Sequence, residues 1–209
     1  SYSVGDEKSI VDKNRKEFYD AIGLTVENVG YQRQIHSDIV QVIGCGGDNG
    51  ASDAMITKEK NLGLAIAVAD CTPVFLYDLK NKVIAAVHSG WQGTVQKILL
   101  KTLLMMQKNY SSKPENIITY IGPSISQNNY EVGTEFAEKF DGNYLIPKGG
   151  KYLLDVSGIN YKMLLDFGIP KNQIQNSELC TYEFSNLFHS YRRDGNLSGR
   201  SLGVIAIKE

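Results

Sequence analysis

Three short runs of aliphatic and aromatic residues follow one another in the middle of the chain, and short polar segments separate them. They cover residues 62–68, 74–77 and 83–87. Runs that are apolar at nearly every position and rich in β-branched residues are typical of strands buried on both faces. Residues 94–110 come next and repeat their apolar side chains at helical spacing. We therefore expect the three strands to pack together and this helix to cover their sheet.

The remaining elements follow from similar patterns. Helices are expected over residues 6–24, 132–140 and 156–167, and further strands over residues 117–121 and 201–207. Residues 31–42 are expected to be extended, and the glycine-rich residues 44–53 to form a loop. A length of 209 residues suits one hydrophobic core. The sequence predicts an α/β protein, a layered α/β sandwich with a mixed sheet, in a single domain over residues 1–209.

Charge and hydropathy exclude two broad classes of partner. The chain has 22 Lys and Arg against 23 Asp and Glu, so its formal charge of −1 gives no general attraction for nucleic acid. No apolar run approaches the roughly 18 residues of a membrane-spanning helix, and the polar N-terminus does not resemble a secretory signal. We expect a cytoplasmic protein, a monomer or small homo-oligomer, that binds neither nucleic acid nor membrane.

Two histidines and one cysteine are the leading candidates for a functional site. The cysteines Cys45, Cys71 and Cys180 form no Cys-x-x-Cys pair, so reduced thiols are expected rather than disulfides or a four-thiolate zinc site. Cys71, His36 and His88 supply one thiolate and two imidazoles, which bind zinc and leave a tetrahedral position open, as in catalytic sites. Taken singly, each is more often a core residue than a ligand. Cys71 and His88, however, lie at the ends of expected strands, where the rim of a sheet carries function.

The turn that follows His88 is a candidate phosphate site. Ser89, Gly90, Trp91 and Gly93 belong to a glycine-bounded connection between a strand and a helix, whose free backbone N–H groups can hold a phosphate. The alternative is an ordinary connection in which glycine permits close packing. Trp91 accordingly either stacks on a purine or fills core.

A basic segment near the C-terminus is a second candidate for phosphate binding. Arg192 and Arg193, with Arg200 nearby, can bind phosphate in a bidentate manner, or they form a solvated turn with an Arg–Asp pair. His189 is a candidate proton carrier, and Glu131 either a base or a complement to a helix dipole. Further polar candidates without an assigned role are Asp53, Asp70, Cys180 and Thr181.

Seven motifs follow one another along nearly the whole chain. They are Gln34-x-His36-Ser37, Asp53-Ala54-x-x-Thr57, Ala69-Asp70-Cys71-x-Pro73-Val74, Ala86-x-His88-x-Gly90-Trp91-x-Gly93, Gly122-Pro123-x-Ile125, Tyr130-Glu131-Val132-Gly133, and Cys180-Thr181 with Ser190-Tyr191-Arg192-Arg193-Asp194. Taken in this order, they resemble the YfiH-like laccase-domain family, once labelled multicopper polyphenol oxidase and now regarded as purine nucleoside phosphorylase.

The resemblance implies an α/β sandwich with a zinc site on His36, Cys71 and His88. The implied activity is phosphorolysis of adenosine, inosine, guanosine and methylthioadenosine to base and sugar 1-phosphate, with adenosine deamination alongside. In deamination, zinc would lower the pKa of a bound water toward about 7 for attack on C6 of adenine. Bacterial relatives are also linked to removing wrong amino acids from peptidoglycan precursors.

Two departures from the family pattern lead to further expectations. The residue after Trp91 is usually Arg or Lys in the family and is Gln92 here, which removes a positive charge. The chain also begins at what resembles the segment after the family's first hairpin, so the usual Thr-Arg-x-Gly-Gly stretch is expected to be absent. Loss of that arginine is expected to weaken or abolish catalysis.

Three other functions remain open on the residues alone. One is a cysteine hydrolase or amidase in which Cys71 is the nucleophile and His88 or His36 the base. Editing of peptidoglycan precursors would be one activity of such an enzyme. Another is a nucleoside-binding domain without catalysis. Copper-dependent phenol oxidation ranks last, because three N/S ligands accept copper but multicopper oxidation needs many more histidines than three.

Overall fold

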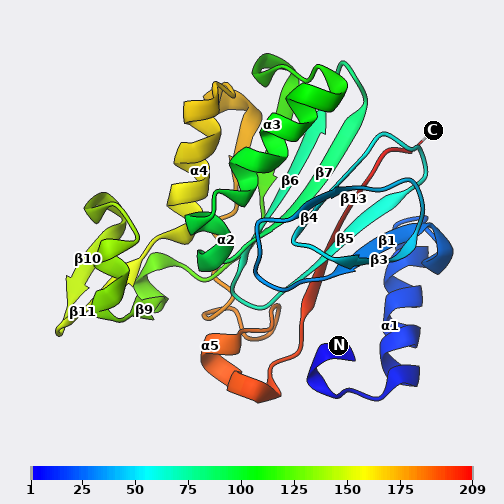
Figure 1. The fold of residues 1–209 in the computed structure, drawn as a ribbon. Coiled ribbons are helices and arrows are strands. Elements are labelled where there is room, and N and C mark those ends of the chain that lie inside the picture. Colours follow the sequence, from blue (N-terminus) through cyan, green and yellow to red (C-terminus); the bar gives the residue numbers. More distant parts are fainter. Residues whose placement is uncertain (1, 209) are drawn as a thin grey trace.

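The computed structural model describes residues 2–208, which form four stacked layers (Figure 1). Two helices cover the outer face of a six-stranded sheet, a four-stranded sheet packs on its inner face, and one helix covers the far side of the second sheet. None of the helices in this part of the chain is long and apolar enough to cross a membrane. Separate apolar clusters fill the spaces between the layers, which confirms the α/β sandwich.

The six-stranded sheet is mixed and has the order β12-β8-β6-β7-β4-β2. Its outer strands pair in parallel with their neighbours and its inner strands pair antiparallel. Helices α3 and α4 bury their apolar faces against it in the largest cluster. The bounds are β2 Val40–Val42, β4 Ala54–Thr57, β6 Thr72–Asp78, β7 Val83–Ser89, β8 Ile117–Ile121, β12 Ile174–Asn176, α3 Ile98–Tyr110 and α4 Val156–Phe167.

The four-stranded sheet has the order β13-β5-β1-β3 and packs between the first sheet and α1. Along β5, Leu64 and Ile66 face the first sheet, whereas Ala65 faces α1. This strand is therefore apolar on both faces, as its sequence predicts. The bounds are α1 Lys8–Ala21, β1 Val29–Arg33, β3 Gly47–Ala51, β5 Gly63–Val68 and β13 Ser201–Ala206.

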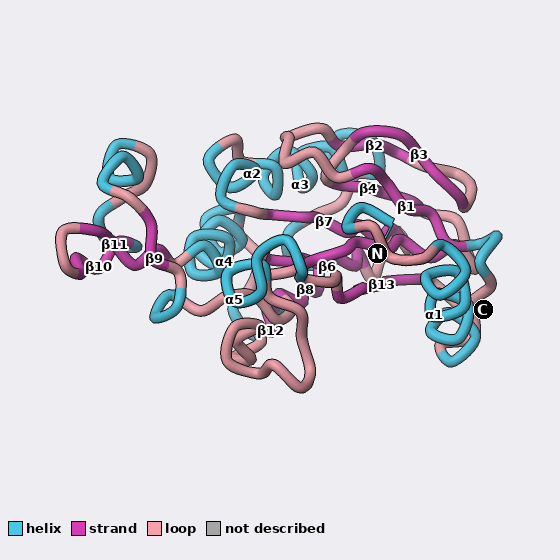
Figure 2. Tube along the Cα trace, turned by 90° about the horizontal axis from the view of Figure 1, so that it is seen from below, coloured by secondary structure: helices cyan, strands magenta, loops and turns pink. Residues whose placement is uncertain are grey.

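A small antiparallel sheet, β10-β11-β9, lies at the end of the molecule opposite α1 (Figure 2). Its strands are β9 Glu131–Val132, β10 Leu145–Lys148 and β11 Lys151–Leu154, and two short α-helices are α2 Trp91–Val95 and α5 Tyr191–Asp194. The 3₁₀ turns are η1 Tyr2–Val4, η2 Val26–Asn28, η3 Pro114–Asn116, η4 Gln127–Asn129, η5 Thr134–Glu138, η6 Gly142–Tyr144, η7 Lys171–Gln173 and η8 Gly195–Leu197.

Most of the expected elements are confirmed within a few residues, including α1, α3, β6, β7 and β13. Strand β8 and helix α4 coincide with the predicted 117–121 and 156–167. The expectation that the first three strands share a sheet is wrong in part, because β5 belongs to the second sheet and meets β6 and β7 face to face.

Three other predictions are corrected. Residues 31–42 are not one extended segment, because the chain turns between β1 and β2 and His36 has φ 59°. The expected loop at 44–53 contains β3, a polar strand that pairs in parallel with β1 at the sheet edge. Residues 132–140 form the end of β9 and a 3₁₀ turn rather than an α-helix. Strands β2, β4, β10, β11 and β12 were not anticipated as separate elements because three or four residues are too short to show a period.

Candidate functional site

The fold brings the three candidate ligands together. His36 lies in the loop after β1, Cys71 directly precedes β6, and His88 is the penultimate residue of β7. Strands β6 and β7 pair with Pro73 opposite His88, which places Cys71 beside the end of β7. The ligand atoms of the three residues all lie within 4.8 Å of one another. Sγ of Cys71 is 3.8 Å from Nε2 of His36, and the two imidazole rings meet edge to face at 5.0 Å.

Asp53, directly before β4, hydrogen bonds to the ring of His88 and to the backbone of the loop that carries His36. Its buried carboxylate accepts a hydrogen bond from Nδ1 of His88 at 2.8 Å. It also accepts backbone N–H bonds from His36 at 3.0 Å and Ser37 at 2.6 Å, and a hydroxyl bond from Ser37 at 2.7 Å. Because Nδ1 of His88 is bound in this way, Nε2 is the nitrogen left to face Cys71. A carboxylate behind a ligating imidazole is the usual outer partner of a metal site.

Asp70, immediately before Cys71, fastens the C-terminal segment to the site. Its carboxylate accepts hydrogen bonds from Oγ1 of Thr181 at 2.6 Å, Oγ of Ser190 at 3.0 Å and the backbone N–H of Arg192 at 2.6 Å. Asp70 itself has φ 85°, in the left-handed region. The carboxylate is therefore fully used within the protein, and its role is to position the loop and the arginine segment.

The protonation of the site is set by attraction between Cys71 and its neighbours. Burial opposes ionisation of the thiol, but the charge of His88 and hydrogen bonds from both histidines outweigh it and lower the pKa of Cys71 to about 6. Burial also opposes the imidazolium of His88, yet the charge of Cys71 and the hydrogen bond to Asp53 raise its pKa to about 9. Near neutral pH the metal-free pair is thus a thiolate beside an imidazolium.

The donor set fits a zinc ion. Tetrahedral Zn²⁺ binds Cys sulfur at about 2.3 Å and His nitrogen at about 2.0–2.1 Å, so its ligand atoms lie roughly 3.5 Å apart. The separation of 3.8 Å between Sγ of Cys71 and Nε2 of His36 is close to this distance between two ligand atoms. Because all the ligand atoms lie within 4.8 Å of one another, only a small movement would bring them to zinc-binding distance. Gly90 allows the approach, because a Cβ there would lie 2.8 Å from Sγ of Cys71 and 3.3 Å from Cδ2 of His36.

A cleft of about 930 Å³ opens over the three ligands. This volume is near the upper end of the roughly 300–1,000 Å³ typical of small-molecule sites. Aromatic and basic side chains dominate the lining. Besides the ligands and Asp70, the cleft is lined by Tyr2, Arg15, Tyr31, Gln32, Arg33, Gln34, Asp48, Ala67, Ala69, Trp91, Tyr130, Tyr191, Arg192 and Arg200.

Of the residues expected to bind phosphate, Arg192 and Trp91 line the cleft. Arg192 stacks over the ring of Tyr130 at 5.0 Å and donates to the carbonyl of Glu131 at 2.6 Å, which fixes its guanidinium at the rim. Trp91 packs against Phe136 with ring centroids 4.9 Å apart. Both side chains are thus held in place before any ligand binds.

The other expected phosphate ligands do not line the cleft. The guanidinium of Arg193 donates to the carbonyls of its own segment and to Asp194. The hydroxyl of Ser89 is buried and hydrogen bonds to Asn160 and Thr94. Gly90 and Gly93 serve close packing, because a Cβ at Gly93 would meet Ile98 at 3.1 Å. These contacts favour the close-packing alternative, and phosphate binding by this turn stays a prediction.

Two further candidates are also engaged elsewhere. Glu131 pairs with Lys151 at 2.7 Å, and His189 packs on Gly199, so neither side chain lines the cleft. Gln92 is exposed outside it as well, and the cleft's positive charge comes from arginines. The sequence reasoning missed Gln32, Arg33 and Arg15, since they carry no spacing that links them to the ligands, and it assigned no role to Tyr130 although that residue begins one of the seven motifs.

Comparison with known proteins agrees with this architecture. The chain is 36% identical to a purine nucleoside phosphorylase of Bacteroides thetaiotaomicron, over 97% of this chain and 82% of that protein. It is 38% identical to a purine nucleoside phosphorylase of Corynebacterium glutamicum, over 97% and 83%. Among solved structures, the YfiH protein of Bacillus licheniformis superposes with a TM-score of 0.94 at 30% identity, covering 98% of this chain and 84% of that one.

The family described as "Multi-copper polyphenol oxidoreductase laccase" matches residues 1–208. YlmD of Geobacillus stearothermophilus gives a TM-score of 0.91 at 26% identity, over 99% of this chain and 83% of its own. Sequence, fold and the clustered His, Cys and His thus point the same way. The chain belongs to the multi-copper polyphenol oxidoreductase laccase family, in which similar sequences are named purine nucleoside phosphorylase.

Proposed function

We propose that this protein is a zinc-dependent purine nucleoside phosphorylase that acts on adenosine, inosine, guanosine and methylthioadenosine, with adenosine deamination as a second reaction. The observation that carries the proposal is the convergence of His36, Cys71 and His88 at the floor of an arginine-lined cleft. The names of the relatives support the reaction class. The chain has three histidines in all, which suits one zinc ion and not a multicopper cluster.

Different side chains of the cleft would bind the purine and the phosphate. Trp91 and Tyr130 offer aromatic faces on which a purine can stack. Arg192 and Arg200 supply positive charge for binding a phosphate, and hydrogen bonds to backbone carbonyls hold both guanidinium groups in fixed orientations. Holding phosphate against the sugar makes the reaction effectively unimolecular. Zn²⁺, when bound, supplies a Lewis acid at this floor.

The protons of the site are controlled by Asp53. Its hydrogen bond keeps the proton of His88 on Nδ1, so that Nε2 is directed to the ligand cluster. Burial opposes ionisation of Asp53, but hydrogen bonds from His88 and Ser37 outweigh it and lower its pKa to about 2. The carboxylate therefore stays charged throughout the physiological range and acts as a fixed counter-charge.

The test combines metal content with product release. Protein purified without chelator is assayed for zinc by mass spectrometry and for hypoxanthine released from inosine and phosphate. Cys71→Ala is expected to lose both, whereas Cys45→Ala, an exposed thiol outside the cleft, is expected to retain both. Release of inosine from adenosine without phosphate tests the deaminase reaction. Full metal content and turnover in Cys71→Ala would refute the proposal.

A cysteine hydrolase is the second candidate, and a specific geometry favours it. Asp53, His88 and Cys71 line up as carboxylate, imidazole and thiol, the order found in cysteine-dependent hydrolases. In that case Cys71 would be alkylated stoichiometrically by iodoacetamide, and hydrolysis of an amide substrate would survive chelation. For the phosphorylase, zinc protects Cys71 from alkylation and a chelator removes both the protection and the activity.

A further inference from the structure

The cleft continues away from the three ligands along β1. Strand β1 pairs with β5 only at its first two residues, Val29 opposite Gly63 and Gly30 opposite Leu64. Farther along, the side-chain amide of Gln34 takes the place of backbone pairing with β5. The amide donates to the carbonyl of Ala67 and accepts from the N–H of Ala67, both at 2.8 Å. Between these two attachments, residues 31–33 line the cleft.

Gln32, in the middle of this stretch, presents a donor without a partner. The residue is 8% exposed, and its Oε1 accepts a hydrogen bond from Oγ of Ser52 at 2.8 Å. Within residues 2–208, its Nε2 is a buried polar atom that makes no hydrogen bond. Burying a donor without a partner is unfavourable, so positions of this kind call for an explanation. An acceptor on a ligand in the cleft would satisfy it.

Two arginines line the same cleft as Gln32. Arg33 is exposed and, within the described residues, forms no ion pair. Arg15, on α1, is stacked with its Cζ 4.3 Å from the ring centre of Tyr2 and 5.1 Å from that of Tyr31. Stacking uses the faces of the guanidinium and leaves its N–H edges for an acceptor.

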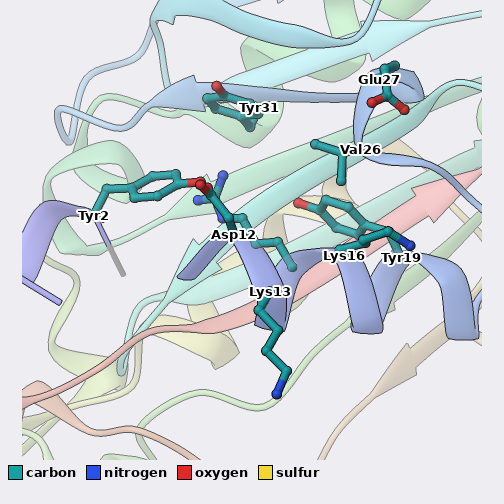
Figure 3. A pocket seen from close by; sticks show the side chains of 9 residues that line it. Tyr2, Asp12, Lys13, Lys16, Tyr19, Val26, Glu27 and Tyr31 are labelled. Carbon is teal, nitrogen blue, oxygen red and sulfur yellow. The ribbon is translucent and has the colours of Figure 1, made fainter. Parts of the chain in front are cut away.

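A smaller cavity of about 330 Å³ adjoins this end of the cleft and shares Tyr2, Arg15 and Tyr31 with it. Figure 3 shows Tyr2 and Tyr31 around this cavity, with Asp12 against the hydroxyl of Tyr2. Asp12 also pairs with Lys8 and interacts electrostatically with Arg15. The cleft lining also includes Asp48, whose Oδ1 accepts a hydrogen bond from the N–H of Gly50. Positive charge is therefore in excess here.

We propose that Gln32, Arg33 and Arg15 form a second anion subsite that holds the 5′-phosphate of a purine nucleotide. The inference rests on the proposed function, since the nucleoside part would lie toward the zinc ligands. Strand β1 leads directly to His36, and three residues of extended chain place the Cα atoms of Arg33 and His36 at most about 11 Å apart. One nucleotide can span that distance. Inorganic phosphate, the co-substrate, has the same chemistry and must be distinguished by experiment.

Trp91 makes a binding test possible without turnover. It is the only tryptophan of the chain and lines the cleft, so its fluorescence reports ligand binding. Zinc-loaded protein is titrated with inosine and with inosine 5′-monophosphate. The monophosphate is expected to bind at least tenfold more tightly than inosine. Arg33→Met and the Arg15→Met/Arg33→Met double variant are expected to remove this advantage and to leave inosine binding as it is.

Lys108→Met is the charge-matched control, because Lys108 is an exposed cation on α3 outside the cleft, and it should bind both ligands as the unaltered protein does. Equal affinity for inosine and its monophosphate in the unaltered protein would overturn the proposal. So would a double variant that raises the KM for inorganic phosphate but binds the monophosphate normally. A protein that prefers the monophosphate but releases no hypoxanthine would refute the proposed reaction alone.

Discussion

Replacing Asp53 by Asn tests whether one buried carboxylate organises the metal centre. One oxygen of Asp53 accepts from Nδ1 of His88 and the N–H of His36, and the other accepts from the N–H of Ile35 and from the N–H and hydroxyl of Ser37. The amide of Asn can keep only one oxygen. Whichever oxygen is replaced, at least two donors lose their acceptor, and the remaining donors face a neutral oxygen.

The magnitude follows from that count. Hydrogen bonds to charged groups contribute about 1.5–3 kcal/mol each, so two of them amount to about 3 kcal/mol or more. For a chain of this size, each kcal/mol lowers Tm by roughly 2–4 °C, which predicts a loss of about 6–12 °C. Loss of an outer partner of a ligating histidine should also weaken zinc binding by roughly 10–100-fold.

The assay pairs urea unfolding with zinc affinity measured by chelator competition. Asp38→Asn is the matched control, because Asp38 is a carboxylate on the loop of His36 that pairs with Lys101 and is not a ligand partner. Retention of both unfolding free energy and zinc affinity in the Asp53→Asn protein would refute the reasoning. The pKa of Asp53, lowered to about 2, adds a signed expectation. Its contribution to stability is complete above about pH 4 and is lost as the pH falls toward 2.

Four further predictions concern the same site. Zinc affinity should rise about tenfold per pH unit between roughly pH 6.5 and 9, because the pKa of His88 is raised to about 9 and its proton must leave; a flat profile in competition titrations would contradict this. The raised pKa of His88 also predicts how the stability of the metal-free protein depends on pH. The charged imidazolium stabilises the fold fully below about pH 6.5, and this stabilisation is lost as the pH rises through 9, which thermal unfolding measures. Gly90→Ala should lower zinc content while the fold remains, because its Cβ would lie 2.8 Å from Sγ of Cys71, and Gly44→Ala, with open space, should not. Asp70→Asn should loosen the C-terminal arginine segment, raise the KM for phosphate severalfold and expose that segment to limited proteolysis.

The sequence patterns predicted the central layers well because their strands are buried on both faces. The run at β5 is apolar at nearly every position, so it lacks the polar face that an amphipathic helix shows. Helix α3, by contrast, has a clear apolar stripe. Strand β3, Gly47–Ala51, could not be predicted in this way. Its residues are polar and glycine-rich, and only pairing with β1 makes them extended. Which sheet each strand joins likewise depends on contacts between distant segments.

Residue type and position along the sequence were enough to predict part of the site. Cys71 and His88 were identifiable because each lies at the end of an apolar strand. The roles of Asp53 and Asp70 were not, since a carboxylate in a turn has many local uses and its partners here lie up to 122 residues away. Arg193 shows the converse, because its residue type suggested phosphate while the carbonyls of its own segment take up its donors.

The conformation of His36 distinguishes the two candidate functions. A cysteine nucleophile needs one imidazole, and His88 with Asp53 behind it would suffice. His36 nevertheless adopts φ 59°, a left-handed conformation that costs a non-glycine residue roughly 1–2 kcal/mol. Hydrogen bonds from its loop to Asp53 offset that cost and hold its Nε2 3.8 Å from the sulfur of Cys71. A second nitrogen held beside the thiolate supplies a third metal ligand, whereas acyl transfer needs only one imidazole, so the conformation of His36 favours the zinc centre over the cysteine hydrolase.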